Sequence, residues 1–268
     1  MPAAGAMIDL HSHVLAGIDD GPGDMEGSIE LARAAERDGV RTLAATPHLR
    51  ADHPAVRLRE LADRCAVLNA RLEQASIGLT VVPGGEVDVI WAQGASDDDL
   101  RLASYGQRGS DLLLETPYGP LPDLFEQMLF GFSLRGFRVL LAHPERNPTL
   151  QRDPERLAAM VHRGVLVQVT ALSLARSDRG SRSRRPALAL VEQGLAHVIA
   201  SDAHAADWRA PDLSAGVAAA ARVAPARAGW MATEAPAAVL AGEPLPDPPA
   251  QAPRRGARRF LRFPRRGR

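Results

Sequence analysis

Short apolar runs alternate with stretches of helical periodicity along most of this 268-residue chain. The apolar runs predict buried strands, because they are rich in aliphatic residues and too short for helices; they cover residues 7–10, 40–46, 79–82, 111–114, 137–142, 165–170 and 195–200. Between them, apolar residues recur every three or four positions, which predicts amphipathic helices. These helices cover residues 25–38, 58–72, 121–135, 154–163, 185–193 and parts of 213–240, with a helical turn at 97–102.

This alternation predicts a parallel sheet covered by helices, an α/β fold. Seven strands without an obvious edge strand favour closure into a barrel, which we expect to occupy residues 1–242 as one domain. Residues 243–268 are Pro-rich and then Arg-rich, so they are predicted to form a flexible tail. The chain lacks an apolar run of membrane-spanning length and a signal-peptide pattern, and we therefore expect a cytoplasmic protein.

Six of the seven predicted strands end in His, Asp or Glu. These residues are His11 and His13, His48, Glu86, Glu115, His143, and Asp202 with His204. In a parallel barrel the C-terminal strand ends meet at one rim, where catalytic groups gather. Nitrogen and oxygen donors suit Mn²⁺, Fe²⁺ or Zn²⁺, and this set is too large for one four-coordinate ion. The pattern therefore predicts two or three divalent ions, with Glu86 as a bridging ligand.

Two further details concern residues near these strand ends. Asp9, two residues before His11, is predicted to orient a histidine ring through its second nitrogen. The sixth predicted strand ends in Gln168, Val169 and Thr170, which offer no obvious metal ligand.

Charge is distributed unevenly although the formal net charge is zero. All 32 basic residues are arginine, and the segment from Gln251 onward contains arginines without any Asp or Glu. The remaining body is therefore acidic, which suits a site for cations. The tail interleaves its arginines with Phe260, Leu261 and Phe263. It is predicted to stay solvated, with weak contact to an anionic membrane surface or nonspecific nucleic-acid binding as the alternatives, and no specific nucleic-acid partner is expected.

The ordered motifs also resemble a known family. They read DLHSH at 9–13, GIDDGP at 17–22, ATPH at 45–48, ETPY at 115–118, HPER at 143–146 and SDAH at 201–204. This set resembles the polymerase and histidinol phosphatase (PHP) superfamily. Within this superfamily, the motif sequences are similar to those of bacterial metal-dependent protein-tyrosine phosphatases associated with capsule and exopolysaccharide synthesis. The resemblance extends over about residues 7–208.

The resemblance implies a distorted (β/α)₇ barrel with three divalent ions at the C-terminal strand ends. The first ion would be held by His11, His13, Glu86 and Asp202, the second by Glu86, Glu115 and His143, and the third by Asp20, His48 and His204. Asp19 is an alternative to Asp20. Arg146 and Arg209 match family arginines that contact the phosphate, a role that the planar guanidinium fork suits.

The expected activity is phosphotyrosine hydrolysis by metal-activated hydroxide. The expected partner is a phosphotyrosine protein, in particular a bacterial tyrosine kinase of capsular or exopolysaccharide synthesis. Two alternatives remain: a phosphomonoesterase for a small molecule such as histidinol phosphate, and a non-catalytic regulatory PHP module. The single Cys65 falls on the apolar face of a predicted helix, so a phosphocysteine mechanism is not expected. Metal identity, the cognate phosphoprotein and the oligomeric state stay open.

Overall fold

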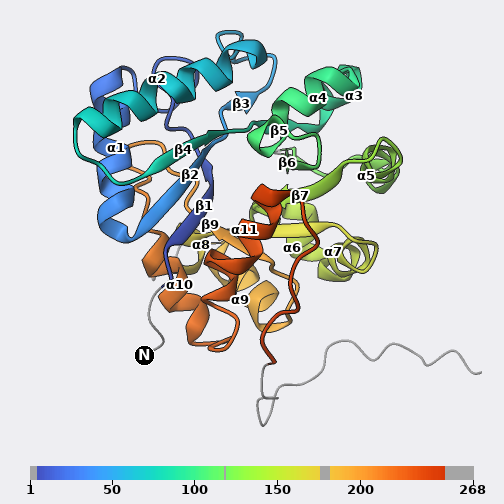
Figure 1. Ribbon diagram of the computed structural model, residues 1–268. Coiled ribbons are helices and arrows are strands. Elements are labelled where there is room, and N and C mark those ends of the chain that lie inside the picture. The colour runs from blue at the N-terminus through green and yellow to red at the C-terminus, as the bar shows by residue number, and fades with distance from the viewer. Residues whose placement is uncertain (1–4, 118, 176–181, 251–268) are drawn as a thin grey trace, which may run out of the picture.

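The computed structural model describes residues 5–117, 119–175 and 182–250. Its strands are β1 Met7–Ser12, β2 Val40–Ala45, β3 His48–Leu49, β4 Thr80–Pro83, β5 Glu86–Asp88, β6 Asp111–Glu115, β7 Arg138–Ala142, β8 Leu166–Thr170 and β9 Val198–Ala200. The helices are α1 Met25–Asp38, α2 Leu61–Gln74, α3 Val89–Gly94, α4 Asp97–Ala103, α5 Phe125–Leu134, α6 Pro148–Arg152, α7 Pro154–Val161, α8 Ala171–Ala175, α9 Arg184–Glu192, α10 Leu213–Ala221 and α11 Glu234–Ala241. Most of the helices surround the central strands (Figure 1).

The strands pair in parallel as two sheets, in the orders β1-β2-β4 and β3-β5-β6-β7-β8-β9. The sheets are continuous along the chain because β2 leads into β3, and β4 into β5, across breaks of two residues. A parallel bridge between Ser12 and Ala203 joins the end of β1 to the segment after β9. Counting each broken strand once gives seven strands in barrel order. The predicted distorted (β/α)₇ barrel is therefore confirmed.

The two strand breaks lie side by side and have a local cause. Pro47 has no N–H to donate to a strand ladder, so β2 cannot continue through it. At the matching place in the neighbouring strand, a Cβ on Gly85 would lie 2.4 Å from Cδ1 of Leu49. After the breaks, His48 and Glu86 are direct partners in the β3–β5 register. The breaks therefore set these two side chains next to each other.

The apolar core divides into two clusters because side chains alternate along each strand. Leu10, Leu113, Leu140 and Val198 belong to the smaller cluster, together with Val239 of α11. The neighbouring strand positions belong to the larger cluster, which packs the strands against the surrounding helices. The barrel is therefore packed on both faces of its strands, and its strand ends are held in fixed positions.

Several helix boundaries differ from the sequence predictions. Helix α5 begins at Phe125 rather than at Leu121, because the residue before Pro122 is disfavoured in helical conformation. Leu121 is instead buried in a loop, where its N–H donates to Oγ1 of Thr149 (3.1 Å). The short helices α3, α6 and α8 were not predicted. Helix α1 covers residues 25–38 as predicted, and Asp24 is its N-cap, whose side chain accepts from the Gly27 N–H.

The division at residue 242 stays a prediction. Leu245, four residues beyond the end of α11 at Ala241, still packs against the larger cluster. The Arg-rich segment from 251 to 268 lies outside the described residues. Within the described ranges, no helix is both long and apolar enough to cross a bilayer.

Candidate metal centre

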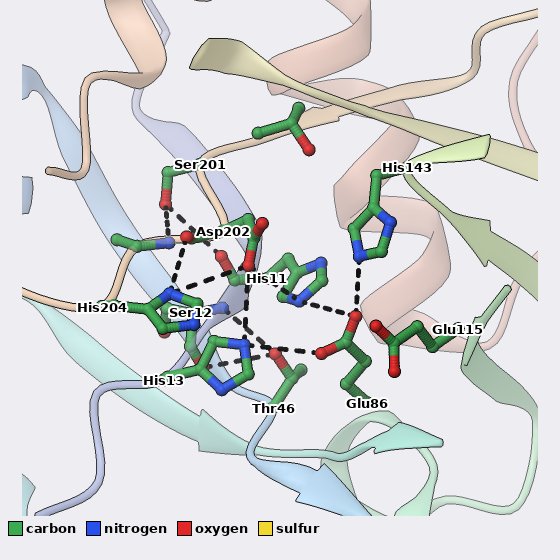
Figure 2. A network of polar contacts seen from close by, with 12 residues as sticks. His11, Ser12, His13, Thr46, Glu86, Glu115, His143, Ser201, Asp202 and His204 are labelled. Carbon is green, nitrogen blue, oxygen red and sulfur yellow. Dashed lines mark hydrogen bonds and ion pairs between the residues drawn. The ribbon is translucent and has the colours of Figure 1, made fainter. Parts of the chain in front are cut away.

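The strand-end residues converge on one site at the C-terminal edge of the barrel (Figure 2). All of the predicted ligands except Asp20 are buried, and they are His11, His13, His48, Glu86, Glu115, His143, Asp202 and His204. The Asp20 side chain is 46% exposed. Burying this many ionisable groups is costly unless each finds a partner, so their convergence needs an explanation beyond packing.

The first predicted ligand set is assembled around two carboxylates. Nε2 of His11 lies 3.4 Å from Oε1 of Glu86 and 3.4 Å from Oδ1 of Asp202. Nε2 of His13 lies 3.5 Å from Oε2 of Glu86 and from the same Asp202 oxygen. The two Nε2 atoms are buried and make no hydrogen bond to any described residue. His11, His13 and Asp202 therefore form one close group of possible metal ligands, and the Glu86 carboxylate borders it with both oxygens.

Glu86 lies at the centre of the wider cluster, as expected for a bridging carboxylate. Its Oε1 is 2.8 Å from Nε2 of His143, and its Oε2 is 2.9 Å from Nδ1 of His48. Glu115 forms a close group with His48 and Glu86, whereas His143 forms one with His11 and Glu86. Glu115 and His143 thus both border Glu86, but they join it in different groups from the single set that the resemblance implied.

The third predicted set lies on the other side of His13. Oδ1 of Asp20 is 3.2 Å from Nε2 of His204 and 3.5 Å from Nε2 of His48. Asp19 differs from Asp20 because its carboxylate is already engaged. It accepts from the N–H groups of Gly21 (3.1 Å) and His48 (3.2 Å) and lies 2.7 Å from Nδ1 of His13. Asp20 is therefore available as a ligand, and Asp19 holds His13 in orientation.

Two supporting roles differ from the sequence expectation. Oε1 of Gln168 lies 3.1 Å from Nδ1 of His11, so Gln168 orients this ring. The prediction that Asp9 orients a histidine ring is wrong. The hydrogen bonds of its carboxylate are instead accepted from the backbone N–H groups of His11 (3.2 Å) and Ser201 (3.0 Å). Burial raises the pKa of Asp9 to about 6. Gln168 lies near the end of β8, the one predicted strand without an evident ligand. This position was the only sequence signal for its supporting role.

The electrostatics of the cluster favour a bound cation. Burial, reinforced by the charge of Glu86, raises the pKa of Glu115 to about 8. Burial also opposes ionisation of Glu86, but the neighbouring histidines outweigh it and hold the pKa of Glu86 well below its usual range. Carboxylates that crowd together beside unpartnered imidazole nitrogens gain most from a divalent ion. The residues present fit such ions.

The two predicted phosphate-binding arginines lie beside this cluster. Nη1 of Arg146 and Nη2 of Arg209 are each 2.6 Å from Oδ2 of Asp202. A cavity of about 140 Å³ is lined by both arginines and by His48, Glu86, Glu115, Thr116, Pro117, His143, Asn147 and Asp202. Positive and negative groups therefore share one small cavity at the strand ends. Tyr118, the last residue of the ETPY motif, lies outside the described residues.

Strained backbone marks three of these residues. His143, Asp202 and Arg209 have φ angles of 32°, 57° and 49°. Such left-handed conformations are unfavourable for residues other than glycine and persist where the surrounding structure imposes them, which is common at functional sites.

The remaining histidines stay outside the cluster, as expected. Nδ1 of His197 accepts from the Val167 N–H (3.1 Å), and His162 contacts the carbonyl of Ala158. His53 stacks on His48 with the ring centroids 4.9 Å apart, so it borders the site.

A family model described as "Capsular polysaccharide synthesis, CpsB/CapC" matches residues 7–240. The chain is 40% identical over 205 residues to tyrosine-protein phosphatase YwqE of Bacillus subtilis (strain 168), which covers 74% of this chain and 77% of that protein. It is 30% identical over 200 residues to the putative tyrosine-protein phosphatase CapC of Staphylococcus aureus, with the same coverage of each chain.

Solved structures agree with this relationship. One comes from a study of YwqE from Bacillus subtilis and CpsB from Streptococcus pneumoniae, described as metal-dependent tyrosine phosphatases. It matches with a TM-score of 0.80 and 32% identity, over 92% of this chain and all of that chain (100%). A β-aspartyl dipeptidase of Fervidobacterium islandicum matches with a TM-score of 0.55 at 15% identity, over 87% of this chain and 74% of that chain. The latter supports the barrel fold alone.

Proposed function

Because the chain belongs to the capsular polysaccharide synthesis CpsB/CapC family, we propose that it is a metal-dependent phosphatase that hydrolyses phosphotyrosine in a protein. The observation that carries this proposal is the convergence of nine His, Asp and Glu side chains and two arginines at one edge of the barrel. The relatives named as tyrosine phosphatases support the choice of substrate.

Three divalent ions, of Mn²⁺, Fe²⁺ or Zn²⁺, would use this donor set. His11, His13, Glu86 and Asp202 would hold the first, and Asp20, His48 and His204 the third. The second would lie beside Glu86, with Glu115 and His143 as its other ligands. Divalent ions bound there would acidify water and neutralise charge on the phosphate oxygens.

The arginines bind and orient the substrate phosphate. Arg146 and Arg209 both point at Asp202 from the cavity wall, so their guanidinium groups are held at the place where a phosphate anion would enter. Two planar forks can hold the non-bridging oxygens while the ester oxygen faces the cavity mouth. Asp202, shared between the arginines and the histidines, fixes the distance between phosphate and metal ligands.

The proposed protein substrate is a tyrosine kinase of capsular or exopolysaccharide synthesis, in keeping with the description of the matching family. The expected cytoplasmic location and the weak membrane contact of the Arg-rich tail stay predictions. Vesicle binding by the full chain and by a chain ending at Pro253 would test the tail.

The proposal is tested by metal analysis together with hydrolysis of a phosphotyrosine peptide. The His143→Ala variant should lose bound metal, and its kcat/KM should fall at least about 100-fold, because His143 would be a direct ligand. The matched control is His162→Ala on α7, which removes a histidine outside the cluster and should retain both properties.

Full activity after exhaustive chelation would refute the metal dependence. Faster turnover of histidinol phosphate than of phosphotyrosine would favour the small-molecule alternative. A protein that binds no metal and turns over neither substrate would support the non-catalytic module.

Cys65 provides an independent check on the mechanism. It is buried on α2, and burial raises the pKa of its thiol to about 12. Because the thiolate is the nucleophilic form, Cys65 is inert at neutral pH. The Cys65→Ser variant should therefore keep its kcat with the phosphotyrosine peptide. A fall in kcat that exceeds the fall in the fraction of folded protein would contradict the metal-dependent mechanism.

A further inference from the structure

Trp208 is an exposed tryptophan at the edge of the candidate metal centre. The residue is 62% exposed, so much of a large aromatic ring, apolar apart from its N–H, faces water. It lies in the loop after β9, directly before Arg209, which lines the cavity. The Trp208 side chain contacts two residues of the site, His204 and Arg209.

Those two contacts hold the indole in a defined orientation. The rings of Trp208 and His204 meet edge to face, with centroids 6.2 Å apart and an interplanar angle of 88°. Cζ of Arg209 lies 5.9 Å from the indole centroid, within the range of a cation–π contact. Arg209 is itself held by Asp202. The indole is therefore fixed relative to the group that would bind phosphate.

The backbone of the loop is also closed. The N–H of His204 donates to the carbonyl of Arg209 (3.0 Å), which ties the two ends of the segment that carries Trp208. Arg209 adopts a φ of 49°, so the chain turns sharply directly after the tryptophan. Strained backbone of this kind clusters at functional sites, and here it holds an exposed aromatic ring beside the cavity, where the ring is available to contact a ligand.

We propose that Trp208 is the platform against which the aromatic ring of the phosphotyrosine substrate packs, and this inference rests on the proposed function. With the phosphate held by Arg146 and Arg209, the phenyl ring must project from the cavity toward its rim. Trp208 adjoins Arg209 at that rim and offers a large aromatic surface. Aromatic rings attract each other beyond their shared apolar area, so the contact favours phosphotyrosine over phosphate esters without a ring.

Calorimetry on the metal-loaded full chain tests this role without turnover. The two ligands are a peptide carrying phosphonomethylphenylalanine, which has the ring, and inorganic phosphate, which lacks it. In Trp208→Ala the Kd of the peptide should rise about three- to tenfold, whereas the Kd of phosphate should stay within about twofold. Trp208→Phe, which keeps a ring, should bind the peptide nearly as tightly as the wild type. The matched control is Phe130→Ala, which removes an aromatic side chain of 61% exposure from α5.

Two results would overturn the platform. If peptide and phosphate weaken by the same factor in Trp208→Ala, the indole acts only by holding Arg209. If neither affinity changes, the ring does not contact Trp208. Failure of the proposed function looks different, because the wild type would then leave the phosphotyrosine peptide unhydrolysed while the ring-dependent difference in Kd persisted.

Discussion

Gln168 offers a sharp test of how the candidate metal centre is organised. The side chain is fully buried at the end of β8, and its Oε1 lies 3.1 Å from Nδ1 of His11. An amide oxygen only accepts, so it keeps the imidazole proton on Nδ1. Nε2 of His11 then presents its lone pair toward Glu86 and Asp202. Gln168→Leu removes this acceptor while it keeps a side chain of similar size.

The expected loss falls on metal affinity rather than on folding. Removing a partner that orients a metal-binding histidine lowers metal affinity about 10- to 100-fold, or roughly 1.4–2.7 kcal/mol. The lost hydrogen bond would destabilise the fold by about 1 kcal/mol. However, Nε2 of Gln168 is buried and has no hydrogen-bond partner among the described residues, so an apolar replacement removes an unsatisfied group. The two effects on stability largely offset each other.

Competition between the protein and a chelator measures the metal affinity of wild type, Gln168→Leu and Gln168→Glu. The glutamate variant keeps an oxygen acceptor and should retain tighter binding than the leucine variant. Urea unfolding of the metal-free proteins gives the change in stability. Wild-type metal affinity in Gln168→Leu would refute the argument, and so would a loss of affinity that is matched by an equal loss of stability.

Two other predictions concern backbone packing and pH. Gly21→Ala should destabilise the protein by about 1–3 kcal/mol in urea unfolding, because its Cβ would lie 1.9 Å from the His13 carbonyl oxygen. Gly23→Ala, where nothing lies within 4 Å, should change stability by less than about 0.5 kcal/mol; equal effects would contradict the steric explanation. Burial, assisted by Arg227, lowers the pKa of His197 from 6.5 to about 4. The unfolded chain therefore takes up a proton before the folded protein does, and stability is lost as the pH falls from 6.5 toward 4, by up to roughly 3 kcal/mol. His197→Gln should reduce this loss, and an unchanged slope of stability against pH would show that His197 does not cause it.

Sequence reasoning succeeded where the information is local. Helix α1 has the predicted bounds 25–38, because it is capped by Asp24 and Gly39 and capping depends on a few adjacent residues. The start of α5 was placed too early because the apolar spacing extends back to Leu121, whereas Pro122 prevents helical backbone there. Periodicity reports which residues are buried, but a proline overrides it locally.

The sequence alone predicted the barrel, the family and the strand-end positions of the candidate ligands, because alternating strands and helices force those ends to one rim. Tertiary structure decided how the candidate ligands group, since that depends on directions in space between segments far apart in the chain. It separated Asp19, whose carboxylate is engaged, from Asp20, which is available. It also brought Gln168 to His11 across 157 positions, and no local pattern encodes this contact.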